Sequence, residues 1–169
     1  MRAHSPLAPG RALLAAAALT FAAGTVVLSD QAPAEHQQQL LLGTWNLNLA
    51  RSRYTPGPPP KTESRSYVVD ADGLKGIIRR TYADGRSETI EYLANYDRVY
   101  PVTGAIGYDA ILLKRVDDRT AEATLTHAGK TFGYARRVVS ADGKTMTISF
   151  RSQSDQSTVD YVAVFEKEE

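Results

Sequence analysis

Few residues in this sequence are of types that perform catalysis, and their spacing favours binding over a reaction. His127 is the only histidine in the β-rich part of the chain, because His4 and His36 precede it. A lone histidine is more often a hydrogen-bonded structural residue than a base or a ligand, and a zinc site needs three or four ligands. The sequence has no cysteine, which excludes thiol catalysis, cysteine-ligated zinc and iron–sulfur clusters. We therefore expect no metal and no cofactor.

The serines and carboxylates form no hydrolytic motif. No serine lies in a Gly-x-Ser-x-Gly turn. Asp117 and Asp118 are adjacent, but they fall in an expected turn, and neighbouring residues of a strand point to opposite faces. The sequence therefore predicts that the protein is not an enzyme, and a catalytic alternative would have to use His127 or Arg136.

A larger group of residues is suited to the wall of a semi-polar pocket. Its members are aliphatic, aromatic or carry one polar tip, and a tyrosine combines an apolar ring with such a tip. The predicted ligand-binding residues are Tyr67, Ile78, Tyr92, Leu125, His127, Tyr134, Arg136, Ile148, Phe150 and Tyr161. Two alternatives stay open. The tyrosines could be ordinary strand and core residues, and Arg136, in phase with Phe132, could pack structurally instead of holding an anion.

These side chains must be positioned by β-strands. Short β-rich runs follow one another from Leu42 onward, separated by turns such as Asp84-Gly85 and Asp142-Gly143. Asp-Gly supplies the positive φ that a two-residue hairpin turn needs. We expect strands near residues 42–49, 62–70, 74–83, 86–94, 98–102, 109–117, 120–128, 131–139, 144–152 and 158–166. Each break is too short for a helical crossover, so neighbouring strands should pair antiparallel.

The serial hairpins predict an all-β fold. About ten strands with one buried face each must close or stack to hide their edges. An antiparallel up-and-down β-barrel of about 8–10 strands is favoured, with a β-sandwich as the alternative. Two segments interrupt the pattern. The proline-rich residues 54–60 are expected to form an extended connection rather than an SH3-type ligand, and residues 101–107 are expected to be a flexible loop on the barrel rim.

The N-terminal residues resemble a targeting segment. Arg2 and Arg11 precede an apolar stretch over residues 12–28, and Ala32-Pro33-Ala34 follows as a small-x-small site. We expect a signal peptide that is cleaved after Ala34, and hence a secreted or periplasmic protein. An uncleaved membrane anchor is the alternative, although the apolar stretch is shorter than the roughly 20 residues that span a bilayer. The expected organisation is a signal peptide over 1–34, a flexible tail over 35–41 and a barrel domain over 42–167.

Composition limits the partners. The chain has 20 Lys+Arg and 19 Asp+Glu, a formal net charge of +1, and its basic residues form no stripe. This balance excludes the electrostatic footprint of a nucleic-acid-binding protein. We expect a monomer, without stable membrane insertion once the signal is cleaved, whose partner is a small hydrophobic or amphipathic ligand.

A motif at the start of the first expected strand resembles a known superfamily. Gly43-Thr44-Trp45 is similar to the Gly-x-Trp motif of the lipocalin and fatty-acid-binding-protein superfamily, the calycins, in which the tryptophan closes one end of the barrel. Further segments resemble small secreted bacterial lipocalin-like proteins, and together they cover most of residues 42–167. These segments are Gly43–Asn48, Ser52–Gly57, Tyr100–Gly104 and Val138–Thr147.

The resemblance implies a barrel with a ligand cavity, in which Gly43 and Trp45 form the closed end. It also implies that an arginine packs on the tryptophan ring, with Arg136 and Arg151 as the candidates. The chain departs from fatty-acid-binding proteins at its last strand, where Ala163 and Phe165 replace the Arg and Tyr that hold the ligand carboxylate. The fatty-acid clamp is therefore missing.

The residues and the resemblance together predict a lipocalin-like protein that binds a small, partly apolar ligand inside the barrel. The alternative is an envelope protein-interaction module, an inhibitor or assembly factor. In that case the barrel would be filled and the loops over 51–61 and 101–108 would carry the function.

Overall fold

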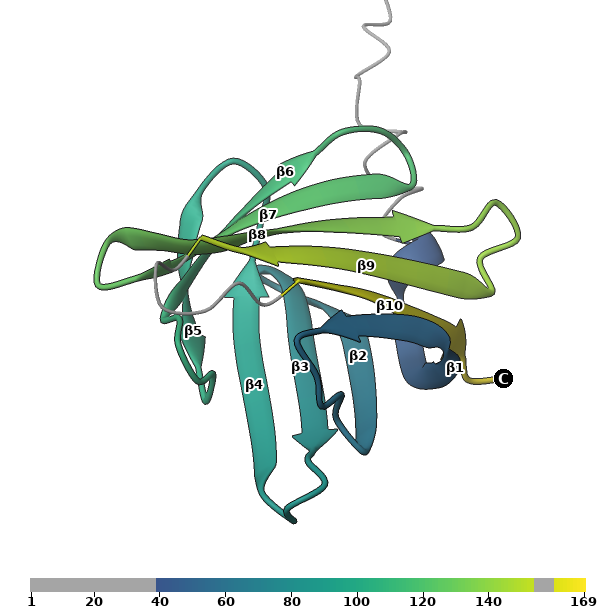
Figure 1. Ribbon diagram of the computed structural model, residues 1–169. Coiled ribbons are helices and arrows are strands. Elements are labelled where there is room, and N and C mark those ends of the chain that lie inside the picture. The colour runs from purple at the N-terminus through teal and green to yellow at the C-terminus, as the bar shows by residue number, and fades with distance from the viewer. Residues whose placement is uncertain (1–38, 154–159) are drawn as a thin grey trace, which may run out of the picture.

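The computed structural model describes residues 39–153 and 160–169, which form a closed β-barrel (Figure 1). The strands are β1 (Gly43–Thr55), β2 (Thr62–Asp70), β3 (Gly73–Thr81), β4 (Ser87–Ala94), β5 (Val99–Thr103), β6 (Ala110–Arg115), β7 (Thr120–His127), β8 (Lys130–Val139), β9 (Thr145–Ser152) and β10 (Asp160–Lys167). The predicted signal peptide over residues 1–34 lies outside the described residues. Within them, no helix has the length and apolar character needed to cross a bilayer.

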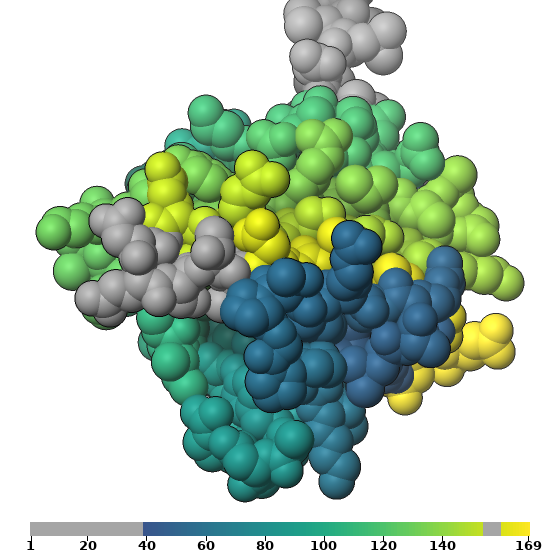
Figure 2. Space-filling model, viewed as in Figure 1, coloured from purple at the N-terminus to yellow at the C-terminus, as the bar shows by residue number. Residues whose placement is uncertain are grey.

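Strand order follows chain order around the whole barrel. Each strand pairs antiparallel with its neighbours in the sequence, and β1 closes the barrel by pairing with β10 as well as with β2. Figure 2 shows β1 in dark blue beside β10 in yellow, with side chains covering this part of the wall. The predicted all-β up-and-down barrel is confirmed, and the sandwich alternative is wrong.

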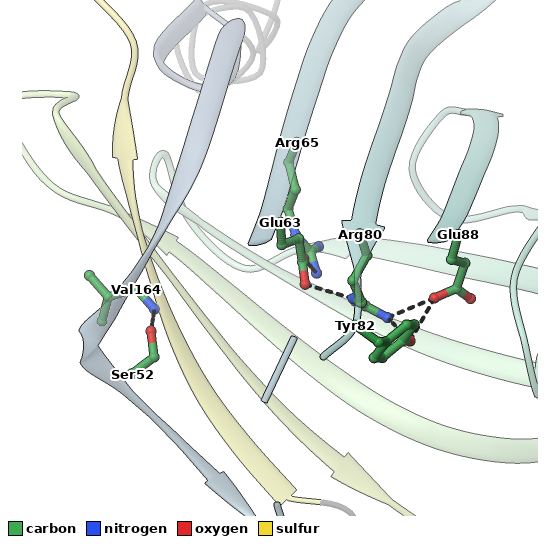
Figure 3. Close-up of polar contacts among 7 residues, drawn as sticks. All are labelled: Ser52, Glu63, Arg65, Arg80, Tyr82, Glu88 and Val164. Carbon is green, nitrogen blue, oxygen red and sulfur yellow. Dashed lines mark hydrogen bonds and ion pairs between the residues drawn. The ribbon is translucent and has the colours of Figure 1, made fainter. Parts of the chain in front are cut away.

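The first strand is longer than expected because one serine repairs its pairing with β10. The register of β1 against β10 shifts between Asn48 and Arg53, and β1 then continues to Thr55 rather than ending near residue 49. The Ser52 hydroxyl donates to the Asn48 carbonyl (2.7 Å) and accepts from the Val164 amide (2.9 Å), as Figure 3 shows for Ser52 and Val164. A polar side chain thus replaces the ladder hydrogen bonds that the shift removes.

Trp45 closes one end of the barrel. It is fully buried, and its Nε1–H donates to the Leu41 carbonyl at 2.8 Å. The cation above its ring is Lys167, with Nζ 5.1 Å from the ring centroid, and this Nζ also donates to the Leu40 carbonyl at 3.1 Å. Neither Arg136 nor Arg151 takes this place, because a residue at the end of β10 is already opposite Trp45.

The segment before β1 belongs to the folded structure in part. Residues 39–41 form one helical turn, which lies beside the C-terminal end of β10 (Figure 1). Leu41 is buried in the same core as Trp45. The fold therefore begins before residue 42, and the tail expected over 35–41 is not wholly flexible, because its last residues cover the tryptophan.

Candidate functional site

The barrel encloses a cavity of about 350 Å³. Its wall comes mainly from apolar and aromatic side chains on β2–β4 and β6–β10 and on the segments after β3 and β5, with a few charged groups among them. The cavity opens at the end opposite Trp45, because Ile106 and Arg86 line it while their side chains are largely exposed to solvent. This size and composition are typical of small-molecule pockets, which start at roughly 300 Å³.

Most of the residues predicted from the sequence lie in this wall. Those that line the cavity are Tyr67, Ile78, Tyr92, Leu125, Ile148, Phe150 and Tyr161. They are brought together from β2, β3, β4, β7, β9 and β10 by the alternation of inward and outward side chains.

Three predicted residues do not line the cavity. Tyr134 is 47% exposed, and Arg136 forms an ion pair with Glu122 on the outer surface, with Nη1 and Oε1 2.8 Å apart. His127 is the last residue of β7, and its largely exposed ring lies 3.5 Å from Asp109 at the rim. These three predictions of an inward position are wrong.

A bulge in β8 explains the error at Tyr134 and Arg136. Leu125 pairs with Gly133, whereas Thr126 pairs with Thr131, so Phe132 is an extra residue in β8. An extra residue reverses which side chains face the core. Phe132 lines the cavity as expected, but beyond it Ala135 and Arg137 face inward. For His127 the cause is different, because the strand simply ends at the rim.

Gly133 permits this bulge to pack. A Cβ at this position would lie 2.6 Å from the Arg151 carbonyl oxygen and 2.7 Å from Cζ of Phe150. The bare backbone lets the Phe150 ring lie against β8. A glycine inside a strand pattern is a known sign of a bulge or of a close approach, so Gly133 was the signal in the sequence that the phase changes here.

A buried polar network at the cavity wall was not predicted. Glu63 accepts from Nε of Arg65 (2.6 Å) and from Nε of Arg80 (2.7 Å). Arg80 also donates from Nη1 to Oε2 of Glu88 (3.1 Å), and the Tyr82 hydroxyl donates to the same oxygen (2.9 Å). Figure 3 shows the side chains of this network on β2, β3, β4 and the turn after β3. Two carboxylates and two guanidinium groups balance in charge.

The network keeps its members ionised despite their burial. Burial acts to raise the pKa of Glu63, but Arg65 and Arg80 outweigh it and hold that pKa below its usual value. Burial acts to lower the pKa of Arg65 and of Arg80, and Glu63 outweighs it in turn, so both pKa values are raised. The arginines and the carboxylates therefore depend on one another for their charge.

Arg137 is the inward arginine of β8 and stands apart from this network. Its side chain lines the cavity, the residue is 8% exposed, and its Cζ lies 5.4 Å from the centroid of the Tyr67 ring. Its Nη2 is buried and has no hydrogen-bond partner. The adjacent Arg136 was predicted for this place, and the bulge at Phe132 exchanges the two.

Stacked aromatic rings line the mouth half of the cavity. Tyr108 stacks on Phe132 with ring centroids 5.8 Å apart, and Phe132 lies 6.0 Å from Phe150. Phe150 in turn stacks on Tyr161 at 5.1 Å. Burial raises the pKa of both Tyr108 and Tyr161, so their phenols stay protonated and remain available as donors.

The segment between β5 and β6 forms one lip of the mouth and is tied to the polar network. Pro101–Thr103 belong to β5, so the loop expected over 101–107 begins later, at Gly104. The Ile106 amide donates to Oε1 of Glu88 at 2.8 Å. One buried carboxylate thus joins the lip to Arg80 and Tyr82.

Replacing Glu88 with alanine is expected to free this lip. The Ile106 amide would lose its acceptor, so its hydrogen exchange should accelerate by about tenfold, the effect of losing one hydrogen bond to a charged group. Exchange at the Ile148 amide, in the central part of β9, is the control for global opening. Equal acceleration at both amides would show that Glu88 stabilises the whole barrel and not the lip.

No group of three or more histidine or acidic side chains within residues 39–153 and 160–169 is arranged to hold a metal ion. The C-terminal positions also differ from a carboxylate clamp. Ala163 and Phe165 are fully buried, and the Phe165 ring packs under Arg65, with Cζ 5.0 Å from the centroid.

No family model and no curated protein matches the sequence. Solved structures do match. One is a redesigned β-barrel, mFAP1, bound to DFHBI, which is 13% identical with a TM-score of 0.39, over 78% of this chain and 99% of that chain. Another is the zebrafish ileal bile acid-binding protein complexed with cholic acid, which is 10% identical with a TM-score of 0.45, over 76% and 99%. These likenesses are too distant to indicate what this chain binds.

Proposed function

We propose that the protein binds a small, partly apolar molecule non-covalently inside the barrel. The observation that carries this proposal is the cavity of about 350 Å³, open at one end and walled by aromatic and aliphatic side chains with a few convergent polar groups. The cavity offers burial of apolar surface along its walls and hydrogen-bond donors at fixed positions. Both are features of a binding site rather than of a filled core.

The proposal includes a carrier or sequestering role without catalysis, outside the cytoplasm. The non-catalytic part is supported by the tyrosines of the wall. Burial raises the pKa of Tyr92 as it does for Tyr108 and Tyr161, so these phenols stay protonated at neutral pH and are not in the form that could act as a general base. The secreted or periplasmic location rests on the basic, apolar and small-x-small pattern of residues 1–34.

The interaction-module alternative assumed a filled barrel, with the loops over 51–61 and 101–108 as functional surfaces. The cavity contradicts the filled interior. In addition, residues 51–55 are part of β1 and residues 101–103 are part of β5. We do not propose this function.

Ala135→Trp is expected to abolish ligand uptake by filling the cavity. Ala135 lines it between Ala123 on β7 and Phe150 on β9, so an indole there would occupy the central space. Uptake is measured as the fluorescence increase of N-phenyl-1-naphthylamine, an uncharged apolar probe, with one probe bound per wild-type barrel.

The matched control is Tyr134→Trp, one residue away on the outer face of β8. It should leave both the affinity and the stoichiometry unchanged, and circular dichroism should show both variants folded. Absence of probe uptake by the wild-type protein, or undiminished uptake by a folded Ala135→Trp variant, would contradict binding in the cavity.

A further inference from the structure

One positive charge inside the barrel has no counter-charge. Arg65 and Arg80 are neutralised by Glu63 and Glu88. Arg137 makes no ion pair with any carboxylate of the described residues, and its neighbours are tyrosines, including Tyr67 below its guanidinium group. The cavity therefore holds one unbalanced cation in its wall.

The cost of this arrangement points to a missing anion. A buried charge without a partner is strongly unfavourable, and buried donors are normally satisfied. Nη2 of Arg137 is buried without a partner, although the residue itself lines the cavity. A guanidinium group presents a planar fork of donors that fits a carboxylate or a similar oxyanion. The chemistry that completes this site is therefore an acid group.

The position of Arg137 sets the direction of the ligand. Toward the closed end the next inward residue of β8 is Val139, which pairs with Met146 in the solid core around Trp45. Toward the mouth the next is Ala135, which pairs with Phe150, the start of the stacked rings. An acid group on Arg137 thus lies at the deep end of the cavity, and the rest of the molecule extends toward the rings.

The phenol of Tyr92 is brought to the same level. Tyr67, Gly76 and Tyr92 are partners across β2, β3 and β4, and Gly76 leaves the space in which the tip of the Tyr92 ring lies. Burial raises the pKa of Tyr92, so this phenol carries a proton. A protonated phenol can donate, and it strengthens a site for an anion.

We propose that the ligand is a small planar organic acid, whose acid group pairs with Arg137 and whose aromatic body packs against the row of rings formed by Tyr108, Phe132, Phe150 and Tyr161. The inference rests on the proposed function and specifies the ligand class. Flat rings gain from offset stacking on aromatic walls, and the rings here form one continuous row because neighbouring centroids lie only 5.1–6.0 Å apart.

The test compares an acid with its uncharged isostere. 2-Naphthoate and 2-naphthamide have the same ring system and the same shape, and each is used to displace bound N-phenyl-1-naphthylamine. The wild-type protein should bind the acid at least about tenfold more tightly than the amide, as expected for one charge-assisted pair. In Arg137→Met this ratio should fall to near one. Acid and amide are compared within the same variant, so a change in its affinity for the probe does not alter the ratio.

Arg136→Met is the matched control, because it removes the neighbouring arginine from the outer face. It should keep the preference for the acid. Arg137→Lys retains the charge without the fork, so it should keep part of the preference and also serves if the methionine variant does not fold.

The possible results distinguish a failure of the acid site from a failure of ligand binding in the cavity. If the wild-type protein binds the probe but treats acid and amide alike, the acid site is wrong and ligand binding stands. A preference that survives in Arg137→Met also overturns the inference, because the acid then binds elsewhere. If the wild-type protein binds no probe, the proposed function fails and the inference fails with it.

Discussion

Glu63→Gln is expected to lower the free energy of unfolding by about 3–5 kcal/mol, the cost of breaking a buried ion pair from one side. The Glu63 side chain is 2% exposed, and its carboxylate accepts hydrogen bonds from Nε of both Arg65 and Arg80. A glutamine has nearly the same shape, so packing is retained and only the charge is lost. Arg65 would then stay buried without a counter-charge.

The measurement is urea unfolding followed by the fluorescence of Trp45, which is the one tryptophan of the chain. Glu166→Gln is the matched control, since Glu166 pairs with Arg51 at 3.4 Å on the surface, where both side chains are about half exposed. That pair should contribute less than about 1 kcal/mol. Similar losses in the two variants would contradict the assignment of a stabilising buried network.

The same variant should change how stability depends on pH. The pKa of Glu63 is lowered in the folded protein relative to its ordinary value of 4.5. Its contribution is therefore complete above that value and is lost as the pH falls through the lower folded pKa. The stability difference between wild type and Glu63→Gln should consequently shrink in acid, below pH 4.5, and should be constant near neutrality. A difference that grows in acid would have the wrong sign for this network.

The barrel could be predicted from the sequence because each strand carries its own signal. Alternation with a period of two marks the strands, and turns such as Asp84-Gly85 mark their ends. Met146, Ile148 and Phe150 alternate with polar residues, and the structure buries all three. The end of β1 was missed because its pairing depends on Ser52 and Val164, which are far apart in the sequence.

The buried charges were harder to predict, although the same alternation contains them. Glu63 and Arg65 are in phase with Tyr67, and Arg80 is in phase with Ile78. Charged residues are rarely buried unless they are paired. Alternation in phase with apolar residues is therefore not enough to predict that these side chains point into the barrel. The decisive fact is that β2, β3 and β4 are neighbours, which places opposite charges beside one another.

Arg136 and Arg137 show the limit of phase arguments at a single strand. Either arginine can face inward, and one extra residue at Phe132 decides between them. Local sequence gives only the glycine that tolerates the bulge, Gly133, and not the partner residues that fix its register. The residue that carries the proposed acid site was therefore one position away from the residue predicted.

Trp45→Ala is expected to lower the free energy of unfolding by about 3–5 kcal/mol, the range for truncating a buried tryptophan. The residue has no exposed surface, and the variant would leave a cavity at the closed end and the Leu41 carbonyl without its donor. Trp45→Phe should cost less, because it keeps an aromatic ring under Lys167 and loses chiefly the indole hydrogen bond.

Because both variants lack tryptophan, unfolding is followed by circular dichroism. Tyr134→Ala, on the outer face, should change stability by about 1 kcal/mol or less. A loss at Trp45 no larger than at Tyr134 would mean that the helical turn and Lys167 hold the closed end without the indole, and that the Gly-x-Trp motif does not serve as a plug here.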